Sequence, residues 1–224
     1  MKFTTIIPCY NGSNYLKEAL DCVLGQLCDE SELIVINDAS TDNTQEIIDS
    51  TRSINLKSIN RIVNGGFCAT RNDGLLEARG EFVSFLDHDD LWPQNRHKII
   101  KDVISQYPDV GMIIGCVEHF FSPEIKHLID RRYKLPSVMQ SQFHSVIRRN
   151  LLDKAGLFDT KLVQGEWLDL ISRIRCLKPK IIFVDDVLYL RRIHDMNFSH
   201  SNKNKMKSFL PSLRDHIARN RDIS

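Results

Sequence analysis

The sequence predicts an α/β fold with a mostly parallel central sheet and helices on both faces. Three observations predict it. Short apolar runs alternate with helical patterns from Phe3 to Cys116, and polar residues cluster where each of the first four runs ends. The composition is that of a globular protein, with 42% hydrophobic and 26% charged residues in 224. Such alternation is typical of parallel strands that are joined by helices packed on the sheet.

The first strand is expected at Phe3–Ile7, where Pro8 stops it because proline cannot donate to a ladder of hydrogen bonds. A helix follows, with apolar residues at helical spacing from Leu16 to Leu27. Ser13 precedes this pattern and is expected to cap the helix through its hydroxyl group. This segment therefore predicts a first strand, a polar loop and a helix.

The same strand and helix patterns then repeat along the chain. Each strand pattern is a short apolar run, and most of the helices begin or end at a glycine, a proline or a capping residue. In order, we expect a strand at 33–36, a helix at 42–51, a strand at 57–63, a helix at 67–78, a strand at 81–86, a helix from Trp92–Pro93 and a strand at 110–116.

An acidic run, Asp87, Asp89 and Asp90, directly follows the apolar segment Phe82–Leu86. Carboxylates this close repel one another, and a divalent cation among them would offset that cost. The alternative is a solvated turn that caps the next helix. In an open parallel sheet, however, ligands bind beyond the carboxyl ends of the strands. The loops after the first four predicted strands all lie there, so we expect a metal and ligand site at that edge.

Charge and cysteine content argue against several other classes of function. The formal net charge is +1, so no overall field favours nucleic acid as a partner. The chain has no apolar run with the length of a signal peptide core or a membrane span, and we therefore expect a cytoplasmic protein. Its six cysteines show no C-x-x-C spacing, which argues against a zinc site and a disulfide framework.

Four motifs carry a resemblance to a known family. They are I-I-P-C-Y-N-G, V-I-N-D-A-S-T-D-N-T, N-G-G-F-C-A-T-R-N-D-G-L and F-L-D-H-D-D-L-W, in this order. The series resembles the family 2 glycosyltransferases of the GT-A type, specifically over Thr4–Trp92 and more weakly beyond. The resemblance implies a Rossmann-like sheet and metal-dependent transfer of a sugar, usually with inversion, from a UDP-sugar to an acceptor hydroxyl. Mn²⁺ or Mg²⁺ would be the metal, and glycan or cell-surface polysaccharide synthesis the setting.

The resemblance also assigns donor-binding roles to residues of these motifs. Pro8 and Tyr10 would pack on the nucleoside. Asp38 would accept the N3 proton of uracil, which cytosine lacks. Arg71 would contact the nucleotide, and Asp87 would bond the ribose. The residues alone leave alternatives open, because Tyr10 can be an aromatic plug at the sheet edge and Arg71 a surface arginine.

Metal-binding roles fall on two further positions. Asp89 matches the second acid of the family's Asp-x-Asp motif, which holds the metal that bridges the two phosphates. His194, in the run Arg191–Asn197, resembles a C-terminal histidine that ligates the metal or bonds a phosphate. Asp90 would cap the next helix or supply a supporting hydrogen bond. Without the resemblance, a lone histidine after a strand is more often a surface residue.

The general base is where the sequence departs from the family pattern. The family carries its base six residues before an arginine, and counting back from Arg173 gives Trp167. The base is then Glu166 or Asp169, which are three residues apart on one helix face. We favour Glu166 because it adjoins the usual position. The alternatives are that both acids merely complement the helix dipole, or that the protein is a non-catalytic scaffold that binds nucleotide-sugars.

The resemblance divides the chain into three parts. Residues 1–117 would bind the donor, residues 118–200 would bind the acceptor and carry the base, and residues 201–224 would form a basic helix. That helix would dock on the domain, pair with a second subunit, or contact the inner face of an anionic membrane. The acceptor, a glycan, a lipid-linked molecule or a protein, stays open, and no nucleic-acid partner is expected.

Overall fold

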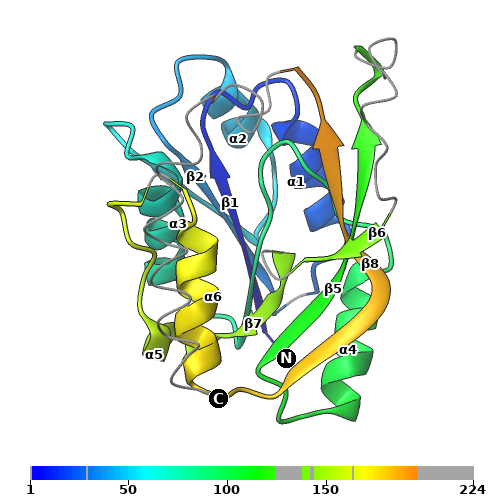
Figure 1. Cartoon of the computed structure of the whole chain (residues 1–224). Helices are drawn as coiled ribbons and strands as arrows, with labels where there is room; N and C mark the ends of the chain where they lie inside the picture. The colour runs from blue at the N-terminus through cyan, green and yellow to red at the C-terminus, as the bar shows by residue number, and fades with distance from the viewer. Residues whose placement is uncertain (1, 29, 125–137, 142–143, 163, 196–224) are drawn as a thin grey trace.

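The computed structural model describes residues 2–28, 30–124, 138–141, 144–162 and 164–195 (Figure 1). The basic helix expected at 201–224 lies outside these residues. In the described part of the chain, no helix has both the length and the apolar character needed to cross a bilayer.

Strands and helices alternate as predicted through the first half of the chain. The elements are β1 Phe3–Cys9, α1 Leu16–Leu24, β2 Glu32–Asn37, α2 Thr44–Ser50, β3 Leu56–Asn60, α3 Gly66–Glu77, β4 Phe82–Phe85, α4 Arg96–Gln106, β5 Met112–Phe121, β6 Val138–Gln140, β7 Val146–Arg148, α5 Arg149–Ala155, α6 Glu166–Cys176 and β8 Ile181–Ile193.

These strands form one eight-stranded sheet in the order β3-β2-β1-β4-β7-β5-β6, with β8 paired to β5. The pairs among β1, β2, β3 and β4 are parallel, and so is the long pair of β5 with β8. The short strand β7 runs antiparallel to both β4 and β5 and joins the two parallel groups. The prediction of a mostly parallel α/β sheet is therefore confirmed, while its antiparallel centre was not foreseen.

Helices cover both faces, as predicted, because successive side chains of a strand point to opposite sides. Ile6 packs in a cluster with residues of α3, α5 and α6. Its neighbour Ile7 packs instead with α1 and α2, and Phe3, on that same face, packs with α4. Figure 1 shows α3, α5 and α6 grouped on one side of the sheet, at the left.

The prediction that Pro8 ends the first strand is wrong by two residues, because β1 continues to Cys9. The carbonyl of Ile6 accepts the Leu86 N–H on the β4 side, whereas the carbonyl of Cys9 accepts the Asp38 N–H on the β2 side. By alternation, the nitrogen of Pro8 faces the β4 side, beyond the last residue of that strand. A proline is tolerated here because no ladder partner needs its missing N–H.

Ser13 does not cap α1, contrary to the prediction. The helix begins at Leu16 after Tyr15, without a side-chain cap. The N–H of Ser13 instead donates to Asp42 in the loop after β2, at 3.0 Å. Burial opposes ionisation of Asp42, but hydrogen bonds from Thr44 and Ser13 prevail and lower its pKa to about 2. The loops after β1 and β2 are thereby bound to each other.

Gly74 allows α3 to lie close against the sheet. A Cβ atom at this position would stand 2.5 Å from Ile6 Cγ2 and 2.9 Å from Ile36 Cδ1. We expect Gly74→Ala to lower the free energy of unfolding by about 1–2 kcal/mol, because overpacking outweighs the gain in helix propensity. Urea denaturation measures the free energy of unfolding of the variant and of the wild type. Leu76→Ala, on the exposed side of the same helix, is the control and should change it by less than about 0.5 kcal/mol. Equal effects of the two substitutions would contradict the close packing.

Candidate active site

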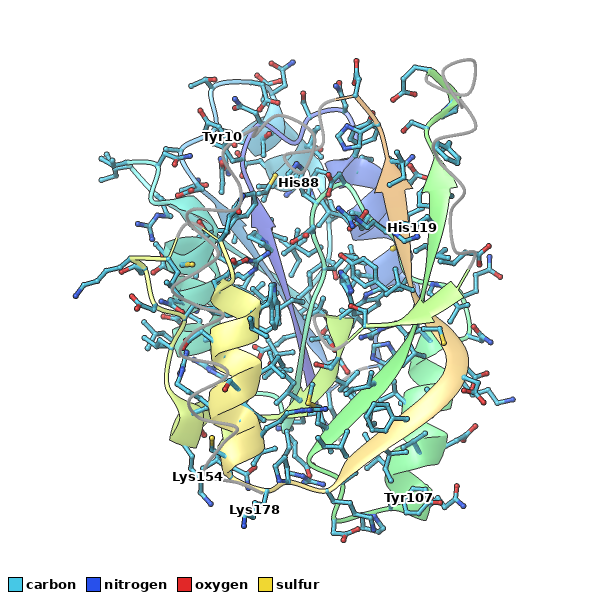
Figure 2. All side chains as sticks on the ribbon, in the orientation of Figure 1. Tyr10, His88, Tyr107, His119, Lys154 and Lys178 are labelled. Atoms are coloured by element: carbon cyan, nitrogen blue, oxygen red, sulfur yellow. The ribbon has the colours of Figure 1, made fainter. Side chains whose placement is uncertain are left out.

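The predicted site residues gather at the edge of the sheet where β1, β2 and β4 end. Tyr10, Asp38 and Asp87 each follow one of these strands within two residues. Figure 2 shows Tyr10 and His88 at this end of the molecule. A Cβ atom on Gly12 would meet Cys9 Sγ at 2.5 Å and His88 Cδ2 at 2.7 Å. The loop after β1 therefore lies directly against the loop Asp87–Asp90 after β4, which we call the acidic loop.

Asp38 is buried at the end of β2 and holds the turn that begins α3. Its two carboxylate oxygens accept the N–H groups of Gly65 at 2.9 Å and Gly66 at 2.8 Å. Arg61 Nε lies 2.9 Å from Oδ1 and pairs with the same carboxylate. Gly66 has a φ of +76°, a backbone conformation that favours glycine. Two of about four acceptor positions of the carboxylate accept hydrogen bonds, Arg61 Nε lies beside Oδ1 as an ion-pair partner without a hydrogen bond, and an acceptor position remains.

Pro8 and Tyr10 occupy different environments. Pro8 is buried inside β1, where its ring belongs to the sheet. The side chain of Tyr10 is 44% exposed at the rim of the site. An exposed aromatic ring offers a flat surface on which a planar ligand group could pack.

Arg71 joins the acidic loop to helix α6. One guanidinium nitrogen lies 3.1 Å from Asp87 Oδ1 and another lies 3.2 Å from Glu166 Oε1. The side chain is buried, and the rings of Phe67 and Trp167 lie within 5.4 Å of it. Burial alone would lower the pKa of Arg71, but the two carboxylates raise it above its ordinary value. The interpretation of Arg71 as a surface arginine is therefore wrong.

Asp89 and His194 meet across the sequence. Nε2 of His194 lies 3.0 Å from Asp89 Oδ2, and Arg192 Nε donates to the Asp89 carbonyl at 2.8 Å. Strand β8 brings the histidine to this place, because it ends at Ile193, one residue earlier. The structure thus brings together the two residues that were predicted as metal ligands.

This pair fits a hard divalent cation that is shared with a substrate. No group of three histidine, cysteine or acidic side chains that could hold a metal occurs among the described residues. Mg²⁺ is usually held by one or two carboxylates together with substrate phosphates and water, and imidazole is a ligand that Mn²⁺ also accepts. Asp89 and His194 could supply that part of a coordination shell.

Tyr189 is a residue of the site that sequence reasoning missed. Its hydroxyl accepts the Asp87 N–H at 3.1 Å and donates to Asp90 Oδ2 at 2.9 Å. The second oxygen of Asp90 accepts the Arg192 N–H at 2.7 Å. Burial, followed by the charges of Asp89 and Asp87, raises the pKa of Asp90 well above its usual range. Asp90 therefore joins the acidic loop to β8 through these two hydrogen bonds and does not cap α4, which begins after Asn95.

Tyr189 could have been found only by its position in the strand pattern. It stands in the apolar run Val187–Leu190, where a hydroxyl group needs a buried partner. That signal shows that a partner exists but does not say which.

Glu166 and Asp169 share helix α6 but have different partners. Glu166 lies in the first turn and pairs with Arg71. Asp169 is buried and accepts from Nε and Nη2 of Arg173, at 3.0 and 2.8 Å. Arg173 also donates to the backbone carbonyls of Gly156 and Leu157, just after α5. Asp169 thus belongs to a contact between two helices, whereas Glu166 faces the acidic loop.

Trp167 fills the position where the family pattern expects an acid. Its ring stands edge-on to Phe85 and Phe158, with centroids 5.1 and 5.0 Å apart. The tryptophan therefore packs against the end of β4.

Comparison with known proteins agrees with this geometry. The family model described as glycosyl transferase family 2 matches residues 4–160. The chain belongs to glycosyltransferase family 2. This confirms the resemblance and makes the protein a transferase.

Individual members of the family are similar over much of the chain. An uncharacterized glycosyltransferase of Rickettsia typhi is 30% identical over 224 residues, which cover 91% of this chain and 68% of that protein. GgaA of Bacillus subtilis, a minor teichoic acid biosynthesis protein, is 34% identical over 140 residues, or 59% of this chain and 31% of GgaA.

The fold is shared with solved members of the class. The crystal structure of S. aureus TarS 1-349 in complex with UDP-GlcNAc superposes with a TM-score of 0.76 at 24% identity. The match covers 98% of this chain and 66% of the TarS chain. This family 2 glycosyltransferase chain thus spans about two thirds of TarS 1-349 and about a third of GgaA. The GT-A type of fold that the sequence predicts is confirmed.

Proposed function

We propose that this protein transfers a sugar from a UDP-sugar to an acceptor hydroxyl, with a divalent cation and with inversion, in the synthesis of a glycan or cell-surface polysaccharide. The observation that carries the proposal is the pair of contacts on the acidic loop. Asp89 meets His194, and Asp87 is linked through Arg71 to Glu166. A candidate metal-binding pair and a candidate base thus both contact one loop.

Asp89 and His194 would hold Mn²⁺ or Mg²⁺ against the diphosphate. When bound, the cation would act as a Lewis acid that neutralises the charge on the departing nucleoside diphosphate. Arg192 donates a hydrogen bond to the Asp89 carbonyl, and the Tyr189 hydroxyl accepts one from the Asp87 N–H. These contacts hold the loop in place before the ligand arrives, which lowers the entropic cost of binding.

Glu166 would take the proton from the acceptor hydroxyl as that oxygen attacks the anomeric carbon. An inverting transfer needs one such carboxylate, opposite the leaving diphosphate. The ion pair with Arg71 orients Glu166 toward the acidic loop, whereas Asp169 is committed to Arg173. Glu166 is therefore our choice between the two acids.

Asp38 would select the nucleobase. Its remaining acceptor position suits an imino N–H, which uracil offers at N3 and guanine at N1, whereas cytosine offers none. TarS, with which this chain shares its fold, was solved with UDP-GlcNAc, and this supports a uridine nucleotide as the first choice. Tyr10 would lie against the base or the ribose at the exposed rim.

Calorimetric titration of UDP, GDP and CDP, each with and without Mn²⁺, tests the donor proposal. We expect UDP to bind in the presence of Mn²⁺ and CDP to bind at least about tenfold more weakly, because Asp38 would face an acceptor instead of a donor. Tighter binding of GDP than of UDP would show that the donor is a guanosine nucleotide and not a uridine nucleotide. Absence of binding by all three nucleotides would overturn the proposed donor site.

The alternative that the sequence left open, a non-catalytic scaffold that binds nucleotide-sugars, disagrees with membership of a transferase family, and its support is Trp167 at the usual base position. It predicts that UDP-sugars bind but that no acceptor, water included, ever releases UDP. A sensitive assay of UDP release separates the two functions. Measured turnover that is lost on replacing Glu166 would exclude the scaffold.

A further inference from the structure

His144 stands beside the acidic loop, and the mechanism above does not use it. Strand β7 pairs with β4 so that Ile147 lies opposite Val83 and Arg148 opposite Phe82. His144 lies two residues before the start of β7 at Val146. Its ring packs against that of Tyr189, with centroids 3.8 Å apart and an interplanar angle of 40°. Because the Tyr189 hydroxyl accepts the Asp87 N–H, this contact places the imidazole beside the acidic loop.

The two ring nitrogens of His144 differ in their surroundings. Nδ1 is 2.9 Å from Ser141 Oγ and forms a hydrogen bond with it. Nε2 makes no hydrogen bond to any residue that the structure describes, and it is not among the buried polar atoms without a partner. The imidazole is therefore held by one nitrogen and by its face, while the other nitrogen is open to a ligand.

The charged groups around the ring belong to the site. The charge of Asp87 raises the pKa of His144, whereas Arg71 and two residues of the paired strands β8 and β5, Arg191 and His119, lower it. Burial, the largest cause, lowers the pKa of His144 to about 4. Near neutral pH the ring is thus uncharged, with one N–H donor and one acceptor, which suits a hydroxyl group.

A sugar hydroxyl is the group that must come to this place if the proposed function holds. The transferred sugar is bonded to the diphosphate, which would lie at Asp89, and its anomeric carbon must be within reach of an acceptor that is deprotonated by Glu166. The line from the acidic loop to Glu166 runs through Asp87 and Arg71. These are the two charges of the donor half that act on His144.

We propose that His144 binds the transferred sugar, with Nε2 hydrogen-bonded to one of its hydroxyl groups. The inference rests on the proposed function and assigns a sugar-recognising residue to the same site. His144 would thus contribute to affinity for the sugar and not for the nucleotide, because Tyr10 and Asp38, which would bind the nucleoside, follow β1 and β2.

Two substitutions separate hydrogen bonding from packing. His144→Phe keeps an aromatic ring that can stack on Tyr189 but removes both nitrogens. His144→Gln removes the ring but places an amide near the position of Nε2. If His144 serves only to pack against Tyr189, the phenylalanine variant should behave like the wild type and the glutamine variant should not. Sugar binding predicts the opposite order.

The measurement is the affinity of the full chain for UDP and for UDP-GlcNAc, UDP-glucose and UDP-galactose, in the presence of Mn²⁺. We expect at least one UDP-sugar to bind more tightly than UDP to the wild type. His144→Phe should lower the affinity for that sugar nucleotide about fivefold and leave that for UDP unchanged, as expected for one lost hydrogen bond. His144→Gln should retain most of the preference.

The outcomes are distinct. An unchanged preference in His144→Phe, or a wild type that binds no UDP-sugar more tightly than UDP, would overturn the role of His144 while the nucleotide site stands. Loss of preference in the glutamine variant alone would show that His144 packs and does not bind. Failure of the wild type to bind UDP at all would instead refute the proposed donor site.

Discussion

Asp89→Asn is expected to abolish Mn²⁺-dependent binding of UDP and to lower sugar transfer by about a thousandfold or more. The substitution keeps the shape of the side chain but removes the charge that would hold the cation, and a metal that stabilises a leaving group contributes several kcal/mol to the transition state. His194 alone would then remain from the pair. Calorimetry with UDP and an assay of UDP release measure the two effects.

Asp102→Asn is the matched control for this variant. Asp102 lies on the exposed side of α4, away from the acidic loop, and its replacement removes the same charge. Its binding and turnover should equal those of the wild type, and both variants should unfold cooperatively. If Asp89→Asn retains metal-dependent binding, the acidic loop is not the metal site and the donor must bind elsewhere.

Glu166→Gln is expected to lower the turnover number by about 10²- to 10⁴-fold, the usual contribution of a general base. The affinity for the UDP-sugar should change little, because glutamine can still accept a hydrogen bond from Arg71. Steady-state kinetics with the donor varied, together with calorimetry, separates the two quantities. An enzyme that binds but does not turn over is the signature of a missing base.

Asp169→Asn provides the comparison within the same helix. It removes the charge from a partly buried ion pair with Arg173, which also holds the end of α5, so we expect a loss of stability of about 1–2 kcal/mol. At a temperature where this variant is folded, its turnover should stay within a few-fold of the wild type. If Asp169→Asn loses turnover and Glu166→Gln does not, the base is Asp169.

The part of the fold that could be predicted is the part with local signals. Alternating strand and helix patterns marked the units from β1 to β5, whereas the order of these strands in the sheet was not predicted. The strand β7 escaped notice because its three residues are too few to show a period. The strand end at Pro8 was predicted wrongly because the effect of a proline depends on whether β4 extends past it, which is a property of the assembled sheet.

The site divides in the same way. Loops that follow strands are visible in the sequence, and the acidic run after β4 needed no structure to be found. Pairings across the chain could not be derived, because 95 residues separate Arg71 from Glu166 and 105 separate Asp89 from His194. The sequence favoured Glu166 over Asp169 only because it adjoins the usual base position, whereas the structure distinguishes the two acids by their arginine partners.

The pairing of β8 with β5 has a consequence for the order in which the site is assembled. The acidic loop is synthesised early, yet Tyr189, Arg192 and His194 belong to the end of β8 and emerge about a hundred residues later. Contacts between such distant parts of a chain form late in folding, because a long loop must close first. Until β8 docks, the loop is a cluster of neighbouring like charges whose buried acid lacks its two donors. Completion of the sheet and maturation of the ligand site are therefore a single event, and a nascent chain that has not reached Ile193 contains the motif without the site.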